Sequence, residues 1–181
     1  MKPYRVRAAL IAVLMACAAP VVGQTADAEA VTAITAVQGE RGPVTNLPMP
    51  RYVSLKANEA NVRRGPSLSH RIDWIFARRD MPLRVVGEYG HWRRVVDREG
   101  MGGWVHYSML SGNRTVIIDR DLLTLRGQPQ PDAVEVAMLE LGVIADLGEC
   151  SADWCRLRAG GYRGWAPKSA LFGVAPEELR D

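Results

Sequence analysis

The sequence predicts an all-β protein in which one small folding unit occurs twice in tandem. The stretch WRRVVDREGMGGWVHYSML, from Trp92 to Leu110, returns as WCRLRAGGYRGWAPKSAL between Trp154 and Leu171. The two copies align at offsets of 61 to 63 residues, and a nearly fixed offset indicates a duplicated unit. Short β-branched runs separated by Gly-rich turns, with no long helical window, predict strands and hairpins in both copies.

Five stretches of the first copy have the pattern of strands: 51–57, 61–63, 83–87, 92–96 and 102–106. Val95 is expected to point inward and Arg94 outward, the half-buried alternation that a small barrel needs. Large aromatic residues help such small units bury enough apolar surface, so two tryptophans in each copy are expected to supply core. Trp92 falls on the strand face opposite Val95 and is expected to be partly exposed.

Residues 1–23 have the layout of a secretory signal peptide. Three basic side chains come first, at Lys2, Arg5 and Arg7. The apolar run 8–19 that follows is too short to cross a bilayer as a helix. Cleavage is expected after Gly23 or after Ala28. The stretch ending at Cys17 also resembles a bacterial lipobox, in which case Cys17 would be lipidated and become the first residue.

The rest of the chain divides into four segments. Residues 24–50 mix Ala, Thr, Val and Gln and end in Gly- and Pro-rich turns, which is typical of a flexible linker. The expected divisions after it are a first domain at 51–113, a second domain at 114–175 and a C-terminal tail at 176–181.

The charge of the chain is distributed unevenly. The full sequence has a net charge of +3, but residues 24–181 hold 20 basic and 20 acidic side chains. Residues 51–113 have a net charge of +5 and residues 114–181 a net charge of −3. The first copy could therefore favour an anionic surface, whereas nothing in the balance indicates a nucleic-acid partner.

The motifs of the first copy resemble the bacterial SH3-like (SH3b) domain, a compact barrel found in exported proteins. The matching positions are Asn61, Val62, Arg63, Gly65, Pro66, Trp92, Val95, Gly103, Trp104, Val105 and Leu110. The resemblance covers roughly residues 55–173 and implies two small SH3-like five-stranded β-barrels in tandem. The second copy has Gln128 in place of Gly65 and Ala166 in place of Val105, so a ligand surface is expected in the first copy.

Cys150 and Cys155 flank four residues of a predicted hairpin turn. In an exported protein such a pair is most simply a disulfide. A metal pair and a redox site are the alternatives. Both fit less well, because no histidine is near in sequence and a redox motif has two intervening residues.

We find no catalytic constellation and expect no catalytic residue, metal or cofactor. His70, His91 and His106 all belong to the first copy, whereas both of these cysteines belong to the second. No phosphate loop, HExxH helix or GxSxG elbow is present. The chain is therefore expected to bind something without transforming it.

The resemblance implies a periplasmic or secreted envelope protein, without a transmembrane segment in its mature form, that recognises peptidoglycan or its peptide stems. The candidate surface combines aromatic faces with cations that could meet carboxylates. It comprises Arg63, Arg64, Trp92, Arg94, Trp104 and Tyr107. The alternatives are a protein–protein adaptor and an accessory subunit of a periplasmic complex.

Overall fold

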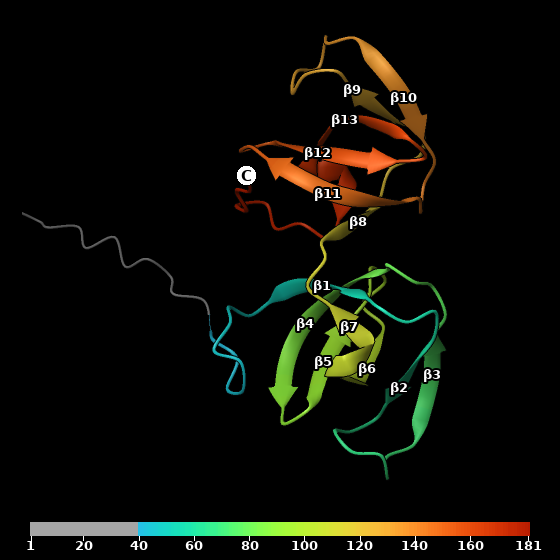
Figure 1. Ribbon diagram of the computed structural model, residues 1–181, viewed down its shortest axis with the longest axis vertical. Coiled ribbons are helices and arrows are strands. Elements are labelled where there is room, and N and C mark those ends of the chain that lie inside the picture. The colour runs from blue at the N-terminus through green and yellow to red at the C-terminus, as the bar shows by residue number, and fades with distance from the viewer. Residues whose placement is uncertain (1–39) are drawn as a thin grey trace, which may run out of the picture. The chain divides into compact units, whose positions relative to one another are not determined.

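The computed structural model describes residues 40–181. The predicted signal peptide, Cys17 and the linker up to residue 39 lie outside the described residues. Across 40–181 the regular structure consists of short strands and two three-residue 3₁₀ helices. The strands form two antiparallel sheets of seven strands each (Figure 1). The predicted all-β fold with two tandem units is confirmed.

The first sheet has the strand order β3-β2-β6-β5-β4-β1-β7. Its elements are β1 (Arg51–Leu55), β2 (Ala60–Arg63), β3 (Ile72–Phe76), β4 (Pro82–Tyr89), β5 (Trp92–Val96), β6 (Gly102–His106), the 3₁₀ helix η1 (Tyr107–Met109) and β7 (Leu110–Ser111). The five predicted stretches correspond to β1, β2, β4, β5 and β6. The sequence pattern misses β3 because its residues do not alternate between buried and exposed, and β7 because two residues are too short for a pattern.

The second sheet repeats this order as β10-β9-β13-β12-β11-β8-β14. Its elements are β8 (Thr115–Ile118), β9 (Leu123–Arg126), β10 (Glu135–Leu139), β11 (Ile144–Cys150), β12 (Trp154–Ala159), β13 (Tyr162–Pro167), the 3₁₀ helix η2 (Lys168–Ala170) and β14 (Leu171–Phe172). Each strand of the first barrel thus has a counterpart in the second. Neither 3₁₀ helix, and no other helix in the described part, is long and apolar enough to cross a membrane.

The two hydrophobic cores are mainly aliphatic. The first contains Leu55, Ala60, Val62, Phe76, Leu83, Val85, Val95 and Val105, and the second is built mostly from the matching positions. The expectation that two tryptophans per copy supply the core is wrong. Four of them, Trp92, Trp104, Trp154 and Trp165, are half-buried on the outward face, because strand alternation gives the inward positions to their neighbours. Trp74 of β3 packs against the first core instead.

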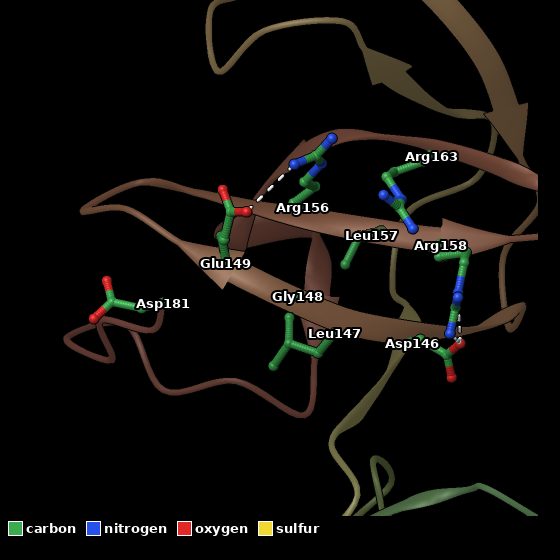
Figure 2. A pocket seen from close by; sticks show the side chains of 9 residues that line it. All are labelled: Asp146, Leu147, Gly148, Glu149, Arg156, Leu157, Arg158, Arg163 and Asp181. Carbon is green, nitrogen blue, oxygen red and sulfur yellow. Dashed lines mark hydrogen bonds and ion pairs between the residues drawn. The ribbon is translucent and has the colours of Figure 1, made fainter.

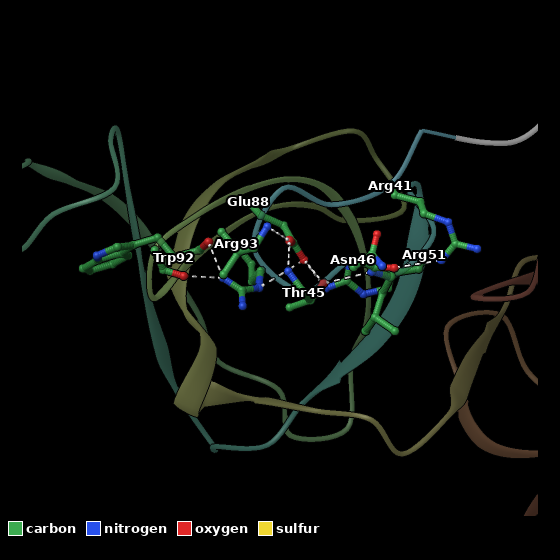
Figure 3. Close-up of polar contacts among 10 residues, drawn as sticks. Arg41, Thr45, Asn46, Arg51, Glu88, Trp92 and Arg93 are labelled. Atoms are coloured by element: carbon green, nitrogen blue, oxygen red, sulfur yellow. Dashed lines mark hydrogen bonds and ion pairs between the residues drawn. The ribbon is translucent and has the colours of Figure 1, made fainter.

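The end of the predicted linker packs against the first barrel. Met49 is buried, and residues 44 and 45 are held by the carboxylate of Glu88, whose side chain is fully buried (Figure 3). This carboxylate accepts hydrogen bonds from the backbone N–H of Val44 (3.1 Å) and from the backbone N–H and hydroxyl of Thr45 (2.9 and 2.6 Å). It also accepts one from Arg51 (2.6 Å). Residues 40–50 therefore contact the fold, because a buried carboxylate needs these donors.

Glu88 and the predicted disulfide occupy the same position in the two barrels. Glu88 of β4 pairs in register with Arg93 of β5, and Cys150 of β11 pairs with Cys155 of β12. The Arg93 Nε atom lies 3.5 Å from the Glu88 carboxylate. Cys150 and Cys155 form the disulfide, which confirms that prediction. One barrel thus closes this register pair with an ion pair and the other with a covalent bond.

The C-terminal segment, residues 173–181, packs on the second barrel. Cys150 and Arg180 exchange two backbone hydrogen bonds, of 2.8 and 3.1 Å. The buried Lys168 ammonium donates to the carbonyl oxygens of Pro176 (3.0 Å) and Glu178 (2.6 Å). The predicted tail is therefore in contact with the domain before it.

Candidate ligand-binding groove

A groove of about 360 Å³ runs along the first barrel beside Trp92. Its lining comes from β2, the loop after β2, the start of β5, the end of β6 and η1. The lining residues are Glu59, Ala60, Asn61, Arg63, Leu68, Trp92, His106, Ser108 and Met109. Grooves of this size suit a small molecule or a few residues of a peptide.

Four rings form a continuous cluster at one end of this groove. Trp92 lies opposite His106 in the β5–β6 register, and their rings meet edge to face with centroids 5.5 Å apart. Tyr107 lies 4.9 Å from His106, and His91 lies 5.6 Å from Tyr107 and 5.9 Å from His106. We call these four residues the ring cluster. Their exposed edges and faces offer an apolar contact surface that carries polar atoms.

Local structure fixes the ring cluster. The β4–β5 turn brings His91 beside Tyr107, whose backbone N–H donates to the His91 carbonyl oxygen (2.9 Å). Gly90 permits that turn because its φ of +49° lies in the left-handed region. The His106 Nδ1 atom lies 2.7 Å from the Ser108 hydroxyl at the start of η1, which orients the imidazole.

Arg63, a predicted site residue, lines the groove but also holds a loop. Its guanidinium donates to the carbonyl oxygens of Leu68 (2.9 Å) and His70 (2.7 Å). The matching Arg126 of the second barrel donates to the carbonyl oxygen of Ala133 (2.9 Å). The structure of the loop therefore explains why arginine occurs at this position in both copies.

Arg64, also predicted, is separate from the groove lining. It shares the carboxylate of Asp73 with Arg71, at 3.2 and 2.8 Å. Hydrogen bonds from Arg71 and Arg64 lower the pKa of Asp73. This exposed pair of arginines is already matched to a carboxylate on its own hairpin.

Arg94 and Trp104 lie on the same outward face as Trp92 but outside the groove lining. They are register partners on β5 and β6, and Arg63 continues this row on β2. Arg94 is exposed and Trp104 is half-buried. Tyr107, half exposed, belongs to the ring cluster. The structure thus brings five of the six predicted residues to one face and places Arg64 apart.

Several residues that line the groove were not predicted from the sequence. Glu59, Leu68, Ser108 and Met109 belong to loops or a short 3₁₀ helix with no distinguishing pattern, and Asn61 was recognised as a motif position but not as a site residue. His106 was the one that could have been found. It lies two residues after Trp104, so it shares the outward face, and it is opposite Trp92 in the hairpin.

The groove offers charged, amide and apolar groups for contact with a ligand. Arg63 and Glu59 supply opposite charges, Asn61 supplies an amide, and the ring cluster supplies apolar surface. Within residues 40–181 no three His, Cys, Asp or Glu side chains are grouped as metal ligands. The two cysteines of this part of the chain are joined to each other, so neither offers a thiolate nucleophile.

The model of the bacterial SH3 domain matches the chain twice, at residues 56–112 and 120–173. The chain belongs to the bacterial SH3 domain family. Each matched range covers one of the two sheets except for its first strand, β1 or β8, so the predicted family and the tandem SH3-like fold are confirmed. Domains of this family are typically non-catalytic modules of cell-wall-associated proteins.

No curated protein matches the chain. Two of the similar solved structures are "NlpC1" and "NlpC2" from Trichomonas vaginalis, each 14% identical in sequence. Their TM-scores are 0.33 and 0.32, and the alignments cover 72% and 68% of this chain. The chain spans 48% of the length of each.

The second SH3 domain lacks the ring cluster. Its counterparts of His91, His106 and Tyr107 are Asp153, Pro167 and Lys168, which leaves Trp154 as the sole ring. The space beside Trp154 is lined in part by Val174 and Pro176 of the C-terminal segment. The two domains therefore share a fold but present different chemistry at this position.

Proposed function

We propose that this protein is a non-catalytic binding module of the cell envelope that recognises peptidoglycan through its peptide stems. The observation that carries the proposal is the groove of the first SH3 domain, which combines opposite charges with the ring cluster. Stem peptides carry free carboxylates, amine groups and small apolar side chains. Arg63, Glu59 and Trp92 would contact these three kinds of group.

Membership of the bacterial SH3 domain family supports an envelope role. The disulfide supports an oxidising compartment, because disulfides persist in exported proteins and are rare in the cytosol. We propose a periplasmic or secreted location on this basis. Lipidation of Cys17 remains a proposal, and metabolic labelling with palmitate tests it: label on the wild type that is lost in Cys17→Ala supports lipidation.

The test is co-sedimentation of the purified protein with isolated sacculi. We expect the wild type to sediment with them and Trp92→Ala to lose most of this binding. The matched control is Trp154→Ala, which removes the corresponding residue of the second domain. Both variants should keep the wild-type melting temperature within a few degrees, because both side chains are half-buried and outside the cores.

Two results would contradict this function. The first is a wild-type protein that stays in solution with sacculi at low ionic strength. The second is Trp92→Ala binding as well as Trp154→Ala. A salt titration adds information, since binding led by charge weakens steeply with ionic strength and binding led by apolar contact does not.

One observation favours a protein–protein adaptor as the second candidate. The edge strand β10 pairs only with β9, and an apolar row along it is exposed, with Val134, Val136 and Met138 at 79%, 38% and 58%. An edge of this kind can accept a strand from a partner. Stoichiometric recovery of one protein from envelope extract, lost in Val136→Lys, would support the adaptor over peptidoglycan binding.

A further inference from the structure

The outward face of the β12–β13 hairpin in the second SH3 domain holds three arginines and two tryptophans. Arg156 pairs in register with Trp165, and the next outward pair is Arg158 with Arg163. A groove of about 330 Å³ lies along this face (Figure 2). The three guanidinium side chains line it together with Gly148 of β11 and the carboxylates of Asp146, Glu149 and Asp181.

Arg158 and Arg163 are like charges placed directly opposite each other on neighbouring strands. Such a cross-strand pair of like charges destabilises a sheet. Asp146 forms an ion pair with one of them, since its carboxylate lies 2.9 Å from the Arg158 guanidinium. Among residues 40–181 the Arg163 side chain has no ion pair and no hydrogen bond, although it is exposed at the groove.

The arrangement favours a carboxylate as the ligand of this face. Two of the three guanidinium groups already bind carboxylates of the chain, Asp146 on Arg158 and Glu149 on Arg156 at 3.3 Å. All four side chains in these pairs are more than a third exposed, so the pairs contribute little stability. A carboxylate of a ligand can therefore displace them at small cost.

We propose that this face is a second binding site, which takes a carboxylate-bearing peptide through Arg163 and Arg158. The first domain has Val96 and Gly102 at the matching register pair, so the site belongs to the second domain alone. The identification of the peptide as a peptidoglycan stem rests on the proposed function. The protein would then hold two stems of one polymer, and simultaneous attachment raises the overall affinity beyond that of either site.

The probe is a soluble muropeptide, a disaccharide with one tetrapeptide stem, titrated to millimolar concentration into the ¹⁵N-labelled protein. We expect amide shifts around Gly148 and in β12–β13, and a separate set around Trp92. Arg163→Gln should weaken the β12–β13 set roughly tenfold to a hundredfold, the loss expected for one hydrogen bond to a charged group. Arg163→Glu should abolish it while keeping a melting temperature no lower than the wild type, because it relieves the repulsion with Arg158.

The control is Arg120→Glu, which changes the net charge equally from an exposed position outside the groove lining. Shifts confined to the surroundings of Trp92 would overturn this inference and leave the proposed function standing. Shifts confined to β12–β13 would support the inference and contradict the first groove. Equal loss in Arg120→Glu and Arg163→Glu would also overturn the inference, since the effect would then be general charge.

Discussion

Glu88→Gln tests how the first SH3 domain is held together. The wild-type carboxylate is fully buried. Burial alone would raise its pKa, but the hydrogen bonds from Thr45, Arg51 and Val44 outweigh burial and lower the pKa from 4.5 to about 2. A shift of that size stabilises the folded state at neutral pH by about 3 kcal/mol. We expect Glu88→Gln to lose about that much, because an amide keeps the shape and removes the charge.

The direction of the pKa shift determines how the stabilisation by Glu88 changes with pH. Because the pKa is lowered on folding, the stabilisation is fully present above about pH 4.5 and is lost as the pH falls towards 2. The difference in the free energy of unfolding between wild type and Glu88→Gln should therefore be about 3 kcal/mol at pH 7 and shrink in acid. Urea denaturation followed by tryptophan fluorescence at pH 7, 5, 4 and 3 measures it.

Glu149→Gln is the control. Its carboxylate is 52% exposed and pairs with an exposed arginine, so its loss should cost under about 0.5 kcal/mol. If the loss in Glu88→Gln is as large at pH 3 as at pH 7, the charge of Glu88 is not the source of the stability. The reasoning would then be refuted even though the residue matters.

Three further predictions concern other parts of the fold. Reducing the Cys150–Cys155 disulfide should lower the stability of the second domain by about 2 kcal/mol and leave the first unchanged, as measured by denaturation with and without dithiothreitol. Gly103→Ala should destabilise the first domain by about 1 to 3 kcal/mol in a thermal melt, because the new Cβ would lie 2.7 Å from a carbonyl oxygen of β2, whereas Gly112→Ala, with open space around it, should cost little. Lys168→Met removes the ammonium that holds the C-terminal segment, so limited proteolysis should cleave that segment faster than in the wild type.

The fold was predictable because the repeat shows the same pattern of strands and turns twice. Two independent copies share their turns and their alternation, and Val95 and Leu157 are buried as that alternation requires. The role of the tryptophans was not predictable from residue type. Size and apolarity indicate a core position for a tryptophan. Along β6, however, Gly103 and Val105 take the inward positions, so Trp104 between them faces outward. Composition likewise indicated a linker at residues 40–50 and could not reveal that Glu88 binds it.

The site was predictable only in part, since a groove joins segments that are distant in sequence. Trp92, Arg94 and Trp104 were found because they lie on one hairpin, where alternation fixes the face. Glu59, just before β2, and Leu68, in the loop between β2 and β3, reach the same groove, and no local pattern connects them to Trp92. The net charge of the second domain also gave no indication of its arginine-rich face. The second domain is acidic as a whole, yet its β12–β13 face gathers three arginines, because the balance of a domain does not describe one of its faces.

Glu88 and Arg93 form an ion pair at one register position of the first domain, and a disulfide occupies the matching position of the second. The two domains are therefore destabilised by different conditions. Proton concentration acts on the ion pair and leaves the sulfur bridge intact, whereas a reductant opens the bridge and leaves the ion pair intact. We therefore expect acid to weaken the domain with the groove and reductant to weaken the domain with the arginine face. Either stress alone would leave the cross-link of one domain intact.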